Sequence, residues 1–324
     1  MKRSTWVAAA LLAVLVLLAG ACGDDDPAID SGSDDDTTTT TEKPTFEAGT
    51  TMATLQQEGK IVVGTKYDQP GFGQLNPTTQ KVEGFDVEIA KLIAVAIFGG
   101  DVDDVESKIE FKESVSANRE PFIENGEVDL VAATYTINDA RKQRVDFAGP
   151  YFEAKQDIMV KSDDATIKGV TDLNGKKVCS VKGSTSAKNL ADKAPQAEAT
   201  LFDTYSLCAE ALTDGRVVAV TTDNTILAGL VQQSGGAFKL VKAPFSDEPY
   251  GIGIKKGDDA FRDFINDRLE EIYDSGEWAE AFEATLGKIG LDTPEPPEVN
   301  RYTGTPAGAT TTTAGGAATT TTKP

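Results

Sequence analysis

Apolar residues in the first half of the chain recur with the spacing of strands and helices in turn. A β-branched run at 60–64 predicts a strand, and the pattern at 85–98 predicts a helix whose apolar residues share one face. Further strands are predicted at 108–111 and 128–132, with a helix between them at 120–125. This order predicts a parallel or mixed sheet flanked by helices.

The same alternation restarts further along the chain. Strands are predicted at 177–181, 200–202 and 217–220, and helices at 186–193, 207–212 and 225–232. An extended piece at 251–254 and amphipathic helices at 259–273 and 278–286 follow. The pattern therefore predicts an α/β protein of two lobes with a late return of the chain. Because ligands of open α/β sheets bind beyond the carboxyl ends of the strands, we expect a site between the lobes.

The first residues resemble an export signal. Lys2 and Arg3 precede an apolar run from Val7 to Leu18 that is too short to span a bilayer. The run ends in Leu18-Ala19-Gly20-Ala21-Cys22, which resembles the lipobox at which a bacterial lipoprotein is cut and acylated on its new N-terminal cysteine. The alternative is an ordinary secretory signal in which Cys22 is incidental.

Asp, Ser and Thr dominate two segments that flank the patterned part of the chain. Neither segment can bury enough apolar surface to offset the entropy of ordering it, so both are predicted to be disordered. The predicted division is a signal peptide at 1–21, a tether at 22–51, lobe 1 at 52–150 and 245–300, lobe 2 at 151–244 and a Thr-rich tail at 301–324.

Charge and histidine content exclude several classes of function. The formal net charge is -21, and a surface that binds nucleic acid needs clustered Lys and Arg, so we expect no nucleic-acid partner. The chain has no histidine, which removes Ser-His-Asp and Cys-His catalytic arrangements and every His-ligated metal site. We therefore expect neither a metal nor a cofactor. A few buried cations can still hold a small carboxylate inside an acidic protein.

Two cysteines remain if Cys22 carries a lipid. In an exported chain, Cys179 and Cys208 are expected to form one disulfide, because oxidising compartments favour it. Two buried reduced thiols are the alternative.

Three charged residues follow predicted strands, where a ligand site is expected. Lys66 comes soon after the first strand, although a surface lysine is the alternative. Arg141 follows a predicted strand at 132–138, with Asn138 as helix N-cap, so that a guanidinium and helix amides can jointly hold a carboxylate. Asp223 follows a strand of lobe 2 and can pair with an ammonium or cap the next helix; the chemistry leaves both open.

Several short motifs follow one another along the chain. They are Gly84-Phe85-Asp86-Val87-Glu88-Ile89-Ala90, Gly126-Glu127-Val128-Asp129-Leu130, Val145-Asp146-Phe147-Ala148-Gly149-Pro150-Tyr151, Gly183-Ser184-Thr185-Ser186 and Tyr250-Gly251-Ile252-Gly253-Ile254-Lys255-Lys256-Gly257. In this order they resemble family 3 of the bacterial solute-binding proteins, the receptors of polar amino acid importers. The resemblance implies a type II periplasmic-binding-protein fold, with two hinge strands near 151–157 and 243–249 and a ligand cleft between the lobes.

The resemblance also implies roles for individual residues. Arg141 matches the arginine that holds the ligand α-carboxylate, and Asp223 matches the aspartate that holds the α-ammonium. Arg119 matches a residue that lines the side-chain pocket of the glutamate/aspartate receptors, and Lys66 falls where those receptors place an arginine. Two cations there suit a second carboxylate. The matching positions with hydroxyl side chains are Ser116, Thr134, Thr136, Ser184 and Thr185, and candidate apolar walls are Tyr67, Phe72 and Tyr205.

We therefore predict a monomeric binding protein without catalytic residues. Its expected ligand is free glutamate or aspartate, and its expected partners are the transmembrane subunits of an ABC permease. Lipid on Cys22 is expected to hold it at the outer face of the cytoplasmic membrane. An amino acid sensor that signals through a membrane partner is the main alternative, because it uses the same site. A cyclic-acid dehydratase on the same scaffold is a further alternative, but the sequence singles out no carboxylic acid for it.

Overall fold

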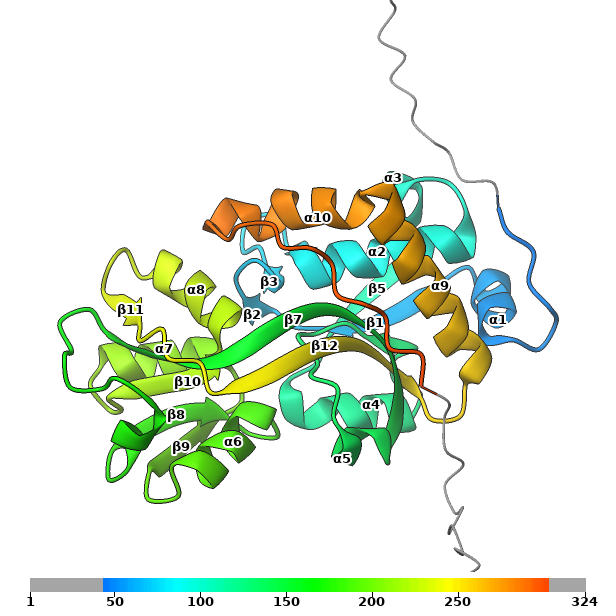
Figure 1. Cartoon of the computed structure of the whole chain (residues 1–324). Coiled ribbons are helices and arrows are strands. Elements are labelled where there is room, and N and C mark those ends of the chain that lie inside the picture. The colour runs from blue at the N-terminus through cyan, green and yellow to red at the C-terminus, as the bar shows by residue number, and fades with distance from the viewer. Residues whose placement is uncertain (1–42, 303–324) are drawn as a thin grey trace, which may run out of the picture. The chain divides into compact units, whose positions relative to one another are not determined.

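A computed structural model describes residues 43–302 of the chain (Figure 1). These residues belong to one of the two units into which the chain divides, residues 39–324. The predicted signal peptide, the lipid attachment at Cys22 and most of the two Asp-, Ser- and Thr-rich segments lie outside the described residues. None of the described helices is both long enough and apolar enough to cross a membrane.

Lobe 1 is built on a short parallel sheet. Its strands are β1, Ile61–Thr65, β5, Ile109–Glu113, and β6, Leu130–Val131. Its first helices are α1, Thr51–Glu58, α2, Phe85–Phe98, α3, Val102–Glu106, α4, Arg119–Glu124, and α5, Asp139–Lys142. The predicted helix at 85–98 is confirmed. It begins after Gly84, where φ is 137° and a Cβ would lie 2.2 Å from the Phe72 carbonyl oxygen, so only glycine fits.

A small antiparallel sheet in lobe 1 has no counterpart in the predicted elements. Its strands are β2, Asp68–Gln69, β3, Gly73–Leu75, and β4, Val82–Glu83. Two or three residues are too few to show the alternation that marks a strand. The sheet matters for function because β2 carries two residues that face lobe 2.

Lobe 2 repeats the alternation of strands and helices. Its strands are β8, Lys177–Val181, β9, Glu198–Phe202, β10, Ala219–Asp223, and β11, Phe238–Leu240. Its helices are α6, Thr185–Lys193, α7, Tyr205–Thr213, and α8, Asn224–Gln233. β8 lies parallel between β9 and β10. The predicted strands and helices of this lobe are confirmed, with ends displaced by a few residues.

Two long strands join the lobes into one mixed sheet. β7, Val145–Lys161, and β12, Ser246–Lys255, pair antiparallel, with Ser246 opposite Gln156 and Lys255 opposite Val145. The sheet runs in the order β5-β1-β6-β12-β7-β10-β8-β9, so β7 passes from lobe 1 into lobe 2 and β12 passes back, as Figure 1 shows. The predicted two-lobed α/β fold with two connecting strands is confirmed.

Aromatic side chains fasten the returning chain to lobe 1. The chain comes back through α9, Asp259–Ser275, and α10, Glu277–Thr285. The rings of Phe85 and Trp278 meet edge to face at 5.5 Å between centroids, and those of Phe152 and Phe282 stack at 6.2 Å. Such pairs add stability beyond the area they bury. They pack the middle of β7, which carries Phe152, against the returning helices.

The strand predicted at 128–132 is confirmed in its central residues, whereas the strand predicted at 132–138 is wrong. Only Leu130 and Val131 form β6, and Thr136 makes an isolated bridge to Tyr250. Thr134 has a φ of 45°, and its N–H donates to the buried carboxylate of Asp86 at 2.8 Å. A residue in the left-handed region cannot continue a strand, so the chain turns there toward α5.

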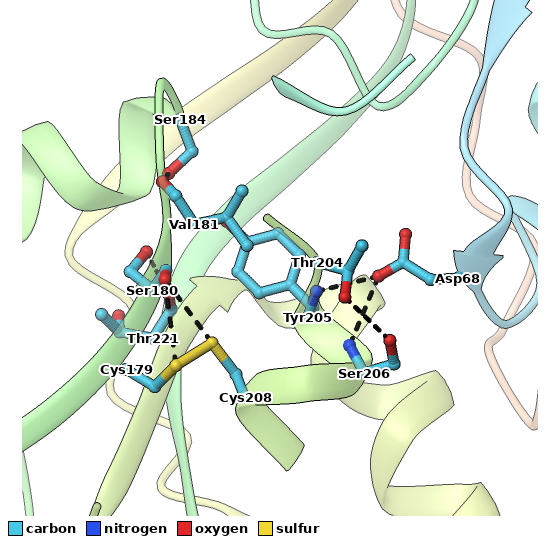
Figure 2. The surroundings of a disulfide bond; sticks show 10 residues. All are labelled: Asp68, Cys179, Ser180, Val181, Ser184, Thr204, Tyr205, Ser206, Cys208 and Thr221. Atoms are coloured by element: carbon cyan, nitrogen blue, oxygen red, sulfur yellow. Dashed lines mark hydrogen bonds between the residues drawn. A yellow bond between two sulfur atoms is a disulfide. The ribbon is translucent and has the colours of Figure 1, made fainter. Parts of the chain in front are cut away.

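A disulfide joins Cys179 of β8 to Cys208 of α7, 29 residues further along the chain, as Figure 2 shows. Both cysteines are fully buried. The predicted disulfide is confirmed, and it fastens α7 to the sheet of lobe 2.

Candidate functional site

Residues of both lobes line a small cavity between them. Those from lobe 1 are Gln69, Ser116, Arg119, Thr134 and Arg141, and those from lobe 2 are Ser184, Thr185, Ser186, Tyr205, Thr222, Asp223 and Ile226. Seven of the nine predicted binding residues are among them. Thr136 lies in the adjoining larger cavity, about 650 Å³ in volume, and its hydroxyl is 3.3 Å from that of Thr185. Lys66 lines neither cavity.

Arg141 is the most tightly held cation of the site. Asn138 caps α5 by accepting from the Arg141 N–H at 3.0 Å, as predicted. The Arg141 guanidinium lies over the Tyr135 ring at 4.6 Å and donates to the Thr136 carbonyl oxygen at 2.7 Å. It also donates to Glu120 at 3.2 Å and, across the cleft, to the Gly183 carbonyl oxygen at 3.4 Å. These bonds fix its planar face beside the cavity.

Arg119 has far fewer partners than Arg141. It is 3% exposed, and among residues 43–302 its side chain makes one hydrogen bond, a long one of 3.4 Å from Nη1 to the Thr134 carbonyl oxygen. Its guanidinium lies over the Tyr135 ring at 5.2 Å. Its Nε has no partner, and within residues 43–302 no carboxylate lies within 4.0 Å of it. Burial and the nearby charge of Arg141 lower the pKa of the Arg119 guanidinium. A buried cation that no carboxylate pairs with directly is costly, so an anionic group of a ligand would be favoured beside it.

Asp223 is the acidic residue of the cavity. It ends β10, and its carboxylate accepts from the Tyr250 hydroxyl at 2.6 Å and from the Ser186 hydroxyl at 3.5 Å. Burial, and then the negative charge of Glu248, raise the pKa of Asp223 to about 7. Although Asp223 occupies the N-cap position of α8, its side chain makes no capping bond. The sequence left open whether Asp223 pairs with an ammonium or caps the next helix. The structure does not support the capping role.

Hydroxyl groups dominate the lobe 2 side of the cavity. The Ser184 side chain accepts from the Ala187 N–H at 2.9 Å and so caps α6. The Ser186 and Thr222 hydroxyls are 3.1 Å apart. Ser186 and Thr222 were not predicted as site residues, although Ser186 ends the Gly-Ser-Thr-Ser motif and Thr222 precedes Asp223.

The left-handed turn at Thr134 is held from two sides. Its N–H bonds to Asp86, which also accepts from the Tyr151 hydroxyl at 2.6 Å, and its hydroxyl is 3.0 Å from Gln69 Oε1. Burial raises the pKa of Asp86 to about 6. The Asp of the Gly-Phe-Asp motif therefore shapes the site without lining it. Gln69 gave no sequence signal, because it lies on the two-residue strand β2.

Lys66 lies apart from the other predicted binding residues. Its side chain is fully buried, and its Nζ is 2.9 Å from Asp68 Oδ1. Burial lowers the pKa of the Lys66 ammonium. The alternative of a surface lysine is wrong. Of the three candidate apolar walls, Tyr205 lines the cavity, whereas Tyr67 donates to the Phe111 carbonyl oxygen and Phe72 packs in the core.

Two lobes that enclose two cations, one carboxylate and a row of hydroxyls define a receptor for a small zwitterionic solute. Among the described residues, no group of three or more Cys, Asp or Glu side chains is placed to hold a metal ion. The model of the bacterial extracellular solute-binding proteins, family 3, matches residues 61–288. The chain belongs to this family and is an amino-acid-binding protein of the ABC transporter type.

Relatives at 42–44% identity include proteins named for glutamate and for glutamine. The chain is 44% identical over 238 residues to the glutamate-binding protein GluB of Corynebacterium glutamicum. This match covers 72% of this chain and 80% of that protein. It is 42% identical over 233 residues to the glutamine-binding protein GlnH of Bacillus subtilis, with 72% and 83% covered. A solved ancestral arginine-binding protein bound to glutamine superposes with a TM-score of 0.64 at 37% identity, over 71% of this chain and 98% of that one.

Proposed function

We propose that this protein is the extracytoplasmic receptor of an ABC importer for glutamate, and that it closes its lobes on the ligand. The proposal rests on the two cations of the cavity, Arg119 and Arg141, which differ in the number of partners that each already has. Arg141 already bonds to a carboxylate and two carbonyl oxygens, whereas Arg119 is buried without a carboxylate within reach among the described residues. A dicarboxylic amino acid supplies one carboxylate to each cation and its ammonium to Asp223.

Glutamine is the competing ligand, and the charge of the site supports glutamate. A neutral side-chain amide next to Arg119 would leave the buried guanidinium without a directly paired carboxylate, which costs more than an ordinary unmade hydrogen bond. The likeness to GluB supports glutamate, and the likeness to GlnH at nearly the same identity is the reason to test glutamine first.

Calorimetric titration of the purified protein with glutamate, aspartate and glutamine tests this proposal. We expect the dissociation constant for glutamate to be the lowest of the three. Tighter binding of glutamine would refute the assignment of glutamate while leaving the amino acid receptor intact. No binding of any of the twenty amino acids would refute the receptor itself.

We further propose that lipid on Cys22 anchors the protein outside the cytoplasmic membrane. Support comes from the Ala19-Gly20-Ala21-Cys22 junction and from the extracellular placement of the family. The Cys22→Ser variant should move from the detergent phase to the aqueous phase on phase separation. Unchanged partitioning would place the anchor elsewhere.

A further inference from the structure

The side chain of Asp68 crosses from lobe 1 to the start of a lobe 2 helix. Its Oδ2 accepts from the Tyr205 N–H at 2.8 Å and from the Ser206 N–H at 3.3 Å, as Figure 2 shows. Asp68 lies on β2 of lobe 1, whereas Tyr205 and Ser206 open α7 of lobe 2. These two bonds therefore exist only while the lobes are closed on each other.

The first turn of α7 takes its capping carboxylate from the other lobe. A helix N-terminus leaves N–H groups without partners inside the helix, and a nearby side-chain oxygen normally accepts from them. Thr204 occupies the N-cap position but makes no capping bond, and its hydroxyl is instead 3.0 Å from that of Ser206. Asp68 takes that place, with a negative charge that the helix dipole favours.

Lys66 holds the capping carboxylate in place. Its Nζ contacts the other carboxylate oxygen, Asp68 Oδ1, at 2.9 Å, and both side chains are at least nine-tenths buried. The opposite charge of Lys66 offsets the burial of Asp68 in lobe 1 and occupies one carboxylate oxygen, while the other faces α7.

The capped turn carries a wall of the ligand cavity. Tyr205, whose N–H donates the shorter bond to Asp68, is 3% exposed and lines the cavity beside Asp223. One turn further along α7, Cys208 is bonded to Cys179 of β8, so the helix cannot shift independently of the lobe 2 sheet. A bond at the start of α7 is therefore transmitted both to the ligand cavity and to the body of lobe 2.

We propose that Asp68, oriented by Lys66, is a latch that caps α7 across the cleft and positions Tyr205 over the bound amino acid. This inference rests on the proposed function, because the latch acts when the lobes close on a ligand. It assigns Lys66 a role through Asp68 and gives Asp68 a role in retaining the ligand.

The test compares wild type with Lys66→Met, which removes the cation that orients Asp68, and with Lys66→Met/Asp68→Ala, in which no buried cation is left unpaired. Relative to wild type, Lys66→Met/Asp68→Ala should speed glutamate release, measured by stopped-flow fluorescence, and weaken binding by about 10- to 100-fold, the range for hydrogen bonds to a charged group. In the Lys66→Met background, Asp68→Asn keeps an acceptor oxygen but no charge. Its glutamate release rate should lie between those of wild type and Lys66→Met/Asp68→Ala. Asp203→Ala is the matched control, because Asp203 is an exposed acid near the same helix end that pairs with Lys182.

Melting temperatures separate a latch from an ordinary structural role. The rise in melting temperature on addition of glutamate should be smaller in Lys66→Met/Asp68→Ala than in wild type, since the latch bonds contribute only when the lobes are closed. A release rate in Lys66→Met/Asp68→Ala equal to that of wild type would overturn the latch while glutamate binding by the wild type still supports the receptor. An equal loss of melting temperature with and without glutamate would also overturn it. Absence of amino acid binding by the wild type would instead overturn the receptor, and the latch with it.

Discussion

The two walls of the cavity differ in charge and in how they are held. Lobe 1 contributes Arg119 and Arg141, whereas lobe 2 contributes Asp223 and hydroxyl groups. The lobe 1 wall is fixed by side-chain bonds into its own turns, such as that from Thr134 to Asp86. The lobe 2 wall sits on helix starts and a strand end, with a disulfide behind it.

This difference indicates how a zwitterion would be divided between the lobes. Carboxylates are suited to the guanidinium groups of lobe 1, and the ammonium is suited to Asp223 of lobe 2. A ligand with both groups therefore contacts both walls and favours the closed arrangement over the open one, since only that arrangement satisfies both ends.

The largest expected effect comes from removing the best-held cation. Arg141→Ala should weaken binding of every amino acid ligand by about 2 to 5 kcal/mol, because a buried charge pair with the α-carboxylate is lost. Calorimetry with glutamate and glutamine measures it. Arg144→Ala is the control, because Arg144 is half-exposed and pairs with Glu124. A loss confined to one of the two ligands would contradict an α-carboxylate role.

Loss of the disulfide should destabilise lobe 2 and leave lobe 1 unaffected. Replacing Cys179 and Cys208 together by alanine opens a loop closed over 29 residues, which costs roughly 3 to 4 kcal/mol in the chain-entropy model. Urea unfolding of wild type and variant gives the difference. A change in stability below about 1 kcal/mol would mean that packing holds α7 without the bond.

A single methyl group on lobe 2 should oppose closure. Gly229 lies within α8, and a Cβ there would lie 2.7 Å from the carbonyl oxygen of Pro70 in lobe 1. Gly229→Ala should favour the helix itself yet weaken glutamate binding by about 1 to 3 kcal/mol, the usual cost of overpacking. Ligand-free stability and affinity are measured on the same variant. Unchanged affinity would show that binding does not need this approach of the lobes.

Asp223 should give binding a moderate dependence on pH. Its pKa of about 7 lies above the ordinary value of 3.8, so the unliganded protein gains stability from its protonation at low pH and loses that stability as pH rises through 7. The ligand ammonium needs the ionised form, so affinity should fall by up to about tenfold for each unit below pH 7. Asp223→Asn should bind more weakly and lose this dependence. A dependence that persists in Asp223→Asn would assign it to another acid, such as Asp86.

The sequence predicted those parts of the fold in which long periodic segments determine the element. Phe85 to Phe98 is an example, and so is the order of lobe 2. It could not predict β2, because two residues carry no period, and so Gln69 and Asp68 escaped notice. It also could not show which partner each cation would take. Position suggested that Lys66 faces a ligand, whereas the fold turns its ammonium to Asp68, two residues along the chain.

The most direct test of the account is the discrimination between glutamate and glutamine at Arg119. Both dissociation constants are measured for wild type, Arg119→Gln and the charge-preserving Arg119→Lys. We expect wild type to prefer glutamate, Arg119→Gln to lose about 10- to 100-fold in glutamate affinity and much less in glutamine affinity, and Arg119→Lys to retain part of the preference. A ratio of the two constants that is the same in wild type and Arg119→Gln would contradict the claim that this buried cation selects a dicarboxylic ligand.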